Sequence, residues 1–248
     1  MTTECRFPSL AEPYATALSE AIAFILERFE VRGIVASGTI VRGNPGPSSD
    51  LDLYVVHAPA WRQRVQRFFN RVPAEIFVNP QPQVLRYFEG EARDGRPLTA
   101  HMLATGFVVL DRDGVIAQLQ ADAASWLAKP PAYGGFARTM QPYLLASQFE
   151  DACDMVESDP DSARLILAPA VRGMLHYAFM RAERYIPRDK DLLVALEGLD
   201  PVLAHLAREY FATPGLAAQM ALAGQIADRT IEARGFFEWE SVPEDVQG

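Results

Sequence analysis

The chain has 248 residues, of which 49% are hydrophobic, and it carries a formal net charge of −9. This length permits one large domain or two ordinary ones, and the hydrophobic share suffices for a sizeable core, which excludes a disordered protein. The acidic balance argues against a nucleic-acid backbone as the main partner, so no nucleic acid is expected. Cys5 and Cys153 stand far apart without a Cys-x-x-Cys, which indicates neither a disulfide framework nor a zinc site.

The start of the chain lacks a basic segment followed by a long apolar run, and no apolar stretch reaches the length that spans a bilayer. A cytoplasmic, soluble protein without a membrane partner is therefore expected, as a monomer or a homodimer.

The first half of the chain mixes helical and strand patterns. Apolar residues recur at helical spacing over residues 9–30. Short β-prone runs predict strands at residues 34–37, 51–56, 74–78 and 107–110. Helices are expected at residues 61–70, 81–90, 96–105 and 115–128. The stretch WRQRVQRFFN at 61–70 is interpreted as an amphipathic helix whose arginines face the solvent.

The second half is predicted to be helical throughout. A Gly- and Pro-rich segment, Lys129–Gly135, marks the expected boundary between a domain of residues 1–130 and a domain of residues 131–248. Helices are expected at residues 136–158, 161–185, 189–197, 201–211 and 215–234. Asp161 and Asp200 are the expected N-caps of two of them. The acidic end from Trp239 to Gly248 is expected to be loose. The predicted fold class is α+β: a small mixed β-sheet flanked by helices, followed by a C-terminal α-helical bundle.

The most informative stretch is GIVASGTIVRGNPGPSSDLDLYVV, from Gly33 to Val56. Successive strand side chains point to opposite faces, so Asp50 and Asp52 share one face about 7 Å apart. Two carboxylates side by side repel each other and raise each other's pKa unless a cation lies between them. Hard oxygen ligands suit Mg²⁺ that carries phosphates. The alternative is a surface strand that happens to carry two aspartates.

The residues Gly38-Thr39, a Gly/Pro/Ser loop and Ser49-Asp50-Leu51-Asp52-Leu53 resemble the signature of the polymerase-β-type nucleotidyltransferases. Within that superfamily the small-molecule branch, the aminoglycoside nucleotidyltransferases, is the most similar. The resemblance is specific over residues 33–56, fair to about residue 80, and vague beyond. It implies a nucleotidyltransferase domain over residues 1–130.

The resemblance also implies an activity: transfer of a nucleoside monophosphate, AMP from ATP or the equivalent from another triphosphate, to a hydroxyl of a small-molecule acceptor. Asp50 and Asp52 would bind one or two Mg²⁺ ions. Glu75, on the neighbouring predicted strand, matches the third catalytic carboxylate and would act as general base or as a further metal ligand. A plain edge-strand glutamate is the alternative.

Six further residues complete the predicted nucleotide site. Backbone amides of Gly38 and Thr39, with the Thr39 hydroxyl, would hold phosphate oxygens, and Ser49 belongs to the same set. Arg42 follows the Gly-Thr turn and could reach the phosphates or simply lie on the surface. In the helical half, Arg172 and Lys190 are candidate clamps for the β- and γ-phosphates, because residues 184–191 are faintly similar to a basic segment of the streptomycin-modifying branch.

The acceptor is the least defined partner. Glu150, Asp154 and Glu157 fall on one face of the predicted helix 136–158, and a solvated acidic face is the plain interpretation. The resemblance favours a cationic, aminoglycoside-like acceptor instead. A different class of function is also open: a nucleotidyltransferase-like toxin–antitoxin or partner-binding module that acts on a protein or without catalysis. The presence of Gly38-Thr39 together with all three carboxylates favours the enzyme.

Overall fold

The computed structural model describes residues 4–240 of the chain. The chain divides into two compact units: the first runs to Ala92 and includes Pro97–Lys129, and the second includes Arg93–Arg96 and runs on from Pro130. Residues 241–248 of the acidic chain end lie outside the described residues. Within the described chain, no helix has both the length and the apolar character needed to cross a membrane.

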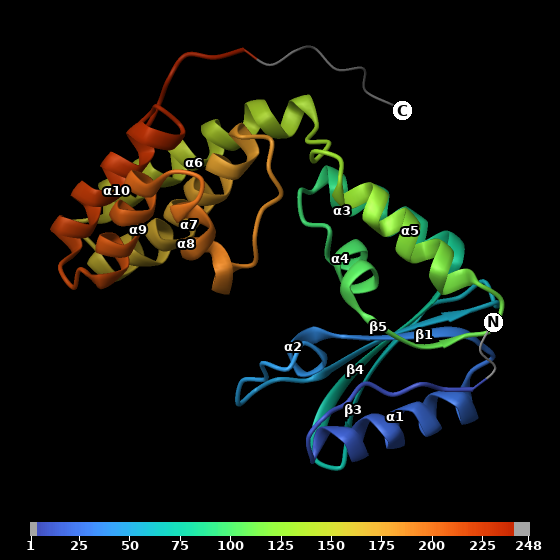
Figure 1. Ribbon diagram of the computed structural model, residues 1–248. Helices are drawn as coiled ribbons and strands as arrows, with labels where there is room; N and C mark the ends of the chain where they lie inside the picture. Colours follow the sequence, from blue (N-terminus) through green and yellow to red (C-terminus); the bar gives the residue numbers. More distant parts are fainter. Residues whose placement is uncertain (1–3, 241–248) are drawn as a thin grey trace. The chain divides into compact units, whose positions relative to one another are not determined.

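A five-stranded mixed sheet forms the centre of the first unit, in the order β3-β4-β2-β1-β5 (Figure 1). The strands are β1 (Val31–Ser37), β2 (Leu51–His57), β3 (Gln63–Phe69), β4 (Val72–Pro80) and β5 (Phe107–Asp111). Strands β2 and β4 are parallel, whereas the other neighbouring pairs are antiparallel. Because β2 and β4 run the same way, the residues that begin both strands lie at one edge of the sheet.

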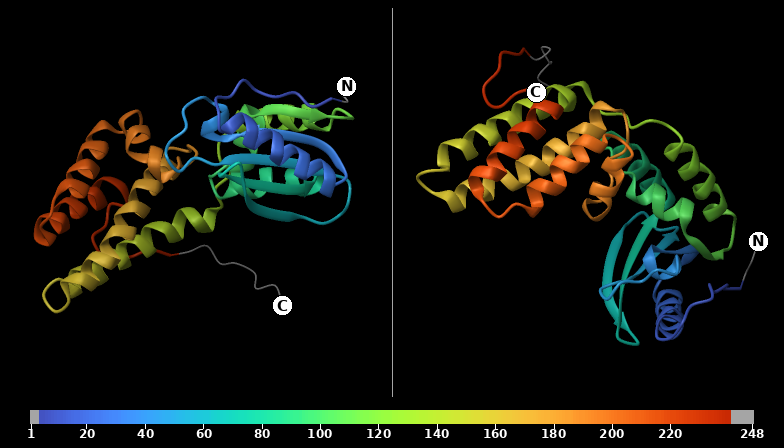
Figure 2. Two further views of the ribbon diagram at one scale, coloured as in Figure 1. Left: turned by 90° about the horizontal axis from the view of Figure 1, so that it is seen from below. Right: turned by 60° about the vertical axis from the view of Figure 1, so that its left-hand side comes forward.

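Helices cover both faces of this sheet (Figures 1 and 2). On one face lies α1 (Tyr14–Arg28), which is shorter than the expected helix 9–30 because it begins only after Pro13. The other face carries α3 (Gln81–Arg93), α4 (Leu98–Thr105) and α5 (Val115–Leu127). Leu18, Ile22 and Ile25 of α1 pack on the odd-numbered β2 residues, whereas Tyr54 and Val56 pack on the opposite side with Phe88 and Leu103. The strand alternation of β2 thus supplies two apolar cores, one per face.

The second unit is a helical bundle, separate in its core from the sheet. Its helices are α6 (Gly135–Met155), α7 (Pro160–Arg181), α8 (Asp189–Glu197), α9 (Pro201–Ala212) and α10 (Leu216–Thr230). Its core is built around the buried side chains of Phe149, Leu167, Met174, Leu196 and Ile226. The predicted fold class, a mixed α+β sheet domain followed by a helical bundle, is confirmed.

Four residues from the first half of the chain, Arg93–Arg96, pack with the second unit. The Gly95 carbonyl accepts a hydrogen bond from the Ile186 amide at 2.8 Å. Gly95 has φ +69, and a Cβ there would lie 2.2 Å from the Tyr133 hydroxyl oxygen, so only glycine fits against this ring. Tyr133 in turn donates its hydroxyl to the Arg184 carbonyl at 2.8 Å.

The interpretation of residues 61–70 as a helix was wrong: they contain the edge strand β3, which pairs antiparallel with β4 from Gln63 opposite Val78 to Phe69 opposite Val72. Asn70 (φ 43) and Arg71 (φ 64) make the two-residue turn between the strands. Val65 and Phe69, four positions apart, point toward the α1 side, and a spacing of four fits a strand as well as a helix. The apolar pattern alone therefore could not separate the two structures.

Two helix ends also differ from expectation. The N-cap of α7 is Asp159 rather than Asp161, because the Asp159 carboxylate accepts from the amides of Asp161 and Ser162 at 3.2 and 3.1 Å. Pro160 follows as the first helical residue, the same arrangement that Asp200 and Pro201 make in α9, where Asp200 is the N-cap as predicted. Helix α6 ends at Met155, so Glu157 lies in the turn after it and not on the helix face.

Candidate active site

Three carboxylates come together at the edge of the sheet where β2 and β4 begin. Asp50 immediately precedes β2, Asp52 is its second residue, and Glu75 lies near the start of β4. One oxygen from each of the three side chains can be chosen so that all lie within 4.8 Å of one another. The strand geometry therefore assembles the acidic cluster from residues 23 positions apart in the chain.

The cluster follows a single cross-strand row. Ser37 at the end of β1 is paired with Asp52 of β2. Asp52 is paired with Glu75 of β4, and Glu75 with Gln66 of β3. Directly paired residues on one face have Cβ atoms about 4.5–5.5 Å apart, so this row holds polar side chains from four strands side by side.

Gly38 brings the backbone against the cluster. It has φ +89, a conformation that L side chains avoid, and it directly follows β1 at the start of the short helix α2 (Gly38–Val41). A Cβ on Gly38 would lie 2.5 Å from Asp52 Oδ2. Because residue 38 is a glycine, the Asp52 carboxylate can lie directly against the backbone at this position.

The loop between α2 and β2 is tied back to α2 by hydroxyl groups. The Thr39 and Ser49 hydroxyls are hydrogen-bonded at 2.7 Å, and the Gly46 amide donates to Ser49 Oγ at 2.8 Å. The Asn44 amide donates to the Thr39 carbonyl at 3.0 Å. These bonds place Thr39 and Ser49 next to each other at the entrance to the strand that carries the aspartates.

Glu75 is held from the edge strand. Arg64 Nε and Gln66 Nε2 both donate to Glu75 Oε1, at 2.6 and 2.8 Å. The Glu75 side chain is only 12% exposed, which would disfavour its charged form, but the bond from Arg64 outweighs burial and lowers the pKa of the carboxyl. Glu75 is therefore an anion at neutral pH.

The chemistry of this donor set fits a divalent cation. Three carboxylates supply hard oxygen ligands, and their mutual repulsion is relieved when a cation binds among them. Asp50, Asp52 and Glu75 would hold a divalent cation, which supplies positive charge at this end of the sheet when it is present.

The remaining predicted nucleotide ligands do not all lie at this edge. Arg42 ends α2 and is exposed. Arg172 on α7 and Lys190 on α8 are exposed residues of the helical unit, and Arg172 lies 3.8 Å from Asp189. The structure thus brings together Gly38, Thr39 and Ser49 with the carboxylates, and the phosphate roles of Arg172 and Lys190 stay predictions.

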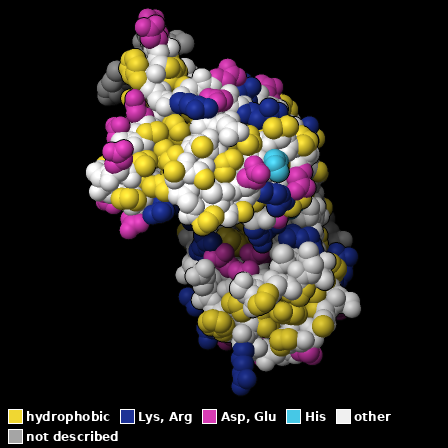
Figure 3. Space-filling view, turned by 90° about the vertical axis from the view of Figure 1, so that its left-hand side faces the viewer, with side chains coloured by type: hydrophobic (Ala, Val, Ile, Leu, Met, Phe, Trp, Pro, Cys, Tyr) yellow, Lys and Arg dark blue, Asp and Glu magenta, His cyan; other side chains and the backbone are white. Residues whose placement is uncertain are grey.

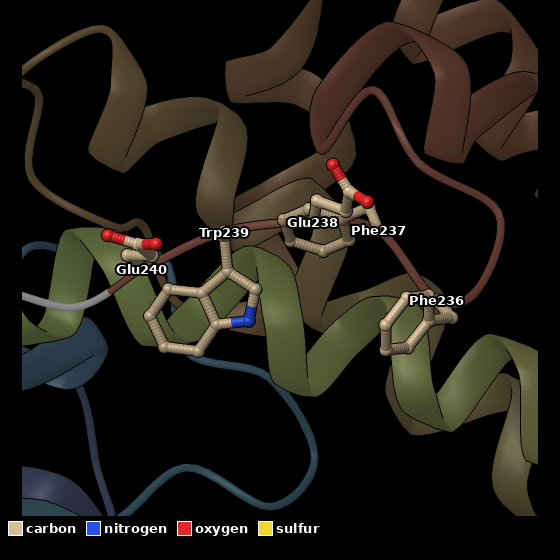
Figure 4. Close-up of a pocket in the computed structure, with 5 residues that line it drawn as sticks. All are labelled: Phe236, Phe237, Glu238, Trp239 and Glu240. Atoms are coloured by element: carbon tan, nitrogen blue, oxygen red, sulfur yellow. The ribbon is translucent and has the colours of Figure 1, made fainter.

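The helical unit has two hollows of about 530 Å³ each. The first borders Pro169, Arg172 and Phe211 and is largely apolar. The second follows the described end of the chain and is lined by five consecutive residues, Phe236–Glu240 (Figure 4). There Trp239 packs on Tyr143 at 5.3 Å between ring centroids, and the Glu238 carboxylate points the other way. The first hollow has Arg172 and Asp189 as its charged lining residues and the second has Glu238 and Glu240, so neither gathers three carboxylates as the sheet does.

In the helical unit, no group of three or more metal-ligating side chains comes together among the described residues. Figure 3 shows hydrophobic side chains interspersed with charged ones over it. Its exposed large hydrophobic residues include Leu165, Val194, Val202 and Phe211. The three-carboxylate edge of the sheet is therefore the strongest candidate site in the described chain.

Arg64 and Gln66 are the site residues that the sequence did not predict. Their position depends on residues 63–69 being a strand, since alternation then directs both side chains to the face that carries Glu75. The sequence did contain a signal for this strand. Arg64, Gln66 and Phe68 alternate with Val65 and Phe69, as in a strand, and Asn70 tolerates the left-handed backbone conformation of a hairpin turn.

Among solved structures the chain is similar to a nucleotidyltransferase-like protein from Exiguobacterium sibiricum, with 12% sequence identity, a TM-score of 0.51, and coverage of 87% of this chain and 73% of that chain. No protein-family model and no curated protein sequence matches the chain. At this identity the likeness establishes the fold, and the activity is argued from the site.

Proposed function

We propose that the protein is a metal-dependent nucleotidyltransferase that moves a nucleoside monophosphate from a nucleoside triphosphate to a hydroxyl group. The observation that carries this proposal is the cluster of Asp50, Asp52 and Glu75, with carboxylate oxygens within 4.8 Å, on a nucleotidyltransferase fold. A structural role does not require Asp52 and Glu75 as direct cross-strand partners with Asp50 beside them, because like charges placed together destabilise a sheet.

In the proposed reaction the acceptor oxygen forms a bond to the α-phosphorus, and the bond from that phosphorus to the bridging oxygen breaks, so that pyrophosphate leaves. Asp50 and Asp52 would hold the cation, whose charge would neutralise the triphosphate. The Thr39 and Ser49 hydroxyls, 2.7 Å apart, offer hydrogen bonds to phosphate oxygens. The acceptor proton goes to Glu75 or to solvent.

ATP is the proposed donor, and a small molecule of the aminoglycoside type is the proposed acceptor. Support for a cationic acceptor comes from the charge of the chain, −9, and from the resemblance of residues 33–56 to the aminoglycoside branch. Glu150, Asp151 and Asp154 are exposed on α6 and add local negative charge. A cleft or face with this charge concentrates a cation, with an effect that salt reduces.

The test is to incubate the protein with each of the four triphosphates, labelled at the α-phosphate, with Mg²⁺ and a panel of hydroxylated acceptors. Label transfer with equimolar pyrophosphate release is expected, and it should stop when EDTA removes the metal. An Asp50→Asn, Asp52→Asn double variant is the matched control for contaminating activity. Triphosphate binding without transfer to any acceptor, equal in wild type and double variant, would favour the partner-binding module instead.

A further inference from the structure

The edge strand β3 makes two direct hydrogen bonds to the third carboxylate of the proposed site. Arg64 Nε lies 2.6 Å and Gln66 Nε2 lies 2.8 Å from Glu75 Oε1. Gln66 is the cross-strand partner of Glu75, and Arg64 is the partner of Phe77, two residues further along β4. Two neighbouring side chains on the same face of one strand thus converge on one oxygen.

Both bonds use Oε1, so neither occupies Oε2. A carboxylate has two oxygens with about four acceptor positions in all, so Glu75 can accept from β3 and still present an oxygen to a cation. Fixing one oxygen sets the direction of the other, as partners outside the ligand shell do for metal-binding carboxylates.

Arg64 is itself held in place, although its side chain is 63% exposed. Its guanidinium carbon lies 4.8 Å from the centroid of the Phe77 ring. Stacking on an aromatic face restrains a planar guanidinium and leaves its N–H groups free to bond in its plane. Phe77 packs at 5.9 Å on Tyr54 of β2, nearly parallel, so the support for Arg64 reaches into the buried face of the sheet.

Arg64 also supplies the counter-charge for the cluster. Its Nε forms an ion pair with Glu75 Oε1 at 2.6 Å. Three carboxylates within 4.8 Å would otherwise repel one another in the absence of a cation.

We infer that Arg64 and Gln66 are positioning residues: from the edge strand they fix Glu75 Oε1, so that Oε2 is presented to the cation of the Asp50–Asp52–Glu75 cluster. This inference rests on the proposed function, because it concerns the same metal centre. It assigns a role to β3, which contributes no ligand of its own to the cluster.

The test uses substitutions that change the contact and keep the net charge. Arg64→Lys removes the planar Nε donor, and Gln66→Met removes the neutral amide donor. Arg67→Lys is the matched control, because Arg67 lies on the same strand but on the opposite face, with its guanidinium carbon 5.0 Å from the Phe24 ring centroid. Mn²⁺ binding to the full chain without nucleotide is measured by the loss of the free-ion electron paramagnetic resonance signal.

Arg64→Lys and Gln66→Met should each weaken Mn²⁺ binding about tenfold, whereas Arg67→Lys should bind as wild type does. Transfer by the Arg64→Lys protein should recover as Mg²⁺ is raised, a rescue that a general loss of fold would not give. Wild-type affinity in both Arg64→Lys and Gln66→Met would overturn the inference. A wild type that binds no Mn²⁺ would overturn the metal centre itself, and with it the proposed function, which is a different result.

A second measurement tests the contact without any metal. The Arg64 Nε–H should give a slowly exchanging resonance in a ¹⁵N correlation spectrum, since its proton is held by a carboxylate. Glu75→Gln should shift or remove that resonance, and saturating Mg²⁺ should leave it in place. Loss of the resonance on adding Mg²⁺ to wild type would show that Arg64 releases Glu75 when the cation binds, which contradicts a positioning role.

Discussion

At the scale of single residues, Gly38 has little freedom to change. Its φ of +89 and the 2.5 Å from its virtual Cβ to Asp52 Oδ2 mean that any side chain would both strain the backbone and displace the carboxylate. No such constraint applies to Gly90 on α3, where an added Cβ would meet nothing within 4 Å.

Gly38→Ala should therefore lower the free energy of unfolding by about 1–2 kcal/mol and reduce transfer more than the stability loss explains. Gly90→Ala is the matched control and should be neutral or stabilising by up to about 1 kcal/mol, because alanine is the better helix former. Chemical unfolding and label transfer measure the two effects. Full activity in Gly38→Ala would show that the position of Asp52 does not depend on this glycine.

The carboxylates themselves make a second residue-scale prediction. Asp50→Asn and Asp52→Asn should each reduce transfer by about a thousandfold or more, because a bound cation contributes several kcal/mol of charge stabilisation. Asp50→Asn should keep or raise the unfolding temperature of the metal-free protein, since it removes one charge from a repelling cluster. Near-normal turnover of either variant at saturating Mg²⁺ would exclude the metal assignment.

These residues also show what the sequence could reveal of the site. Strand alternation predicted that Asp50 and Asp52 share a face, and the resemblance to the nucleotidyltransferases pointed to Glu75, which the parallel pairing of β2 with β4 brings beside Asp52. Arg64 was not predictable, because its role depends on a cross-strand pairing that no local pattern specifies. Arg172 and Lys190 were proposed only from resemblance. In the structure, the acidic partner of Arg172 is Asp189, which belongs to the same helical unit.

At the scale of elements, most helices and strands followed from local signals, and β3 did not. Its apolar residues stand four apart, a spacing common to both regular structures, and its turn, Asn70-Arg71, lacks the glycine that usually marks a hairpin. Residues 63–69 form a strand because they pair with β4. A short stretch of sequence does not show which other segment it will pair with.

The start of α7 offers an element-scale prediction. Asp159→Ala should lower the free energy of unfolding, because Asp159 accepts from two otherwise unpaired amides of the first turn. Asp161→Ala should cost clearly less, since Asp161 contributes an exposed ion pair with Arg164 and a favourable charge near the helix start. Urea unfolding of both variants measures the difference. An equal or larger cost for Asp161→Ala would mean that Asp161 is the cap after all.

At the scale of the whole molecule, acidic side chains outnumber basic ones by 32 to 23, yet several carboxylates are held as anions by specific partners. The pKa values of Asp113, Asp200 and Asp228 are lowered, in each case first by a hydrogen bond from an arginine: Arg32, Arg229 and Arg234 respectively. Carboxyls whose pKa is lower in the folded than in the unfolded state stabilise the fold above the unfolded pKa. That stability is lost as pH falls through the folded pKa. Acid should therefore destabilise this protein even though it also reduces the net negative charge.

Asp200 is the carboxyl on which this can be measured. Arg229 Nε and Nη2 donate to its two oxygens at 2.6 and 2.8 Å, while its side chain also caps α9. Asp200→Asn keeps a good capping residue and removes the charge, so it should cost about 0.5–1 kcal/mol at pH 7, a modest value because the Arg229 side chain is 42% exposed. The difference in unfolding free energy between wild type and variant should persist at pH 5 and disappear below the ordinary aspartate pKa of 3.8, as Asp200 becomes protonated.

Asp151→Asn, an equal charge change at an exposed position on α6, is the control and should show little difference at any pH. Urea unfolding of the three proteins at pH 7, 5 and 3 measures these gaps, and a gap for Asp200→Asn that is as large at pH 3 as at pH 7 would show that the ion pair with Arg229 is not its source.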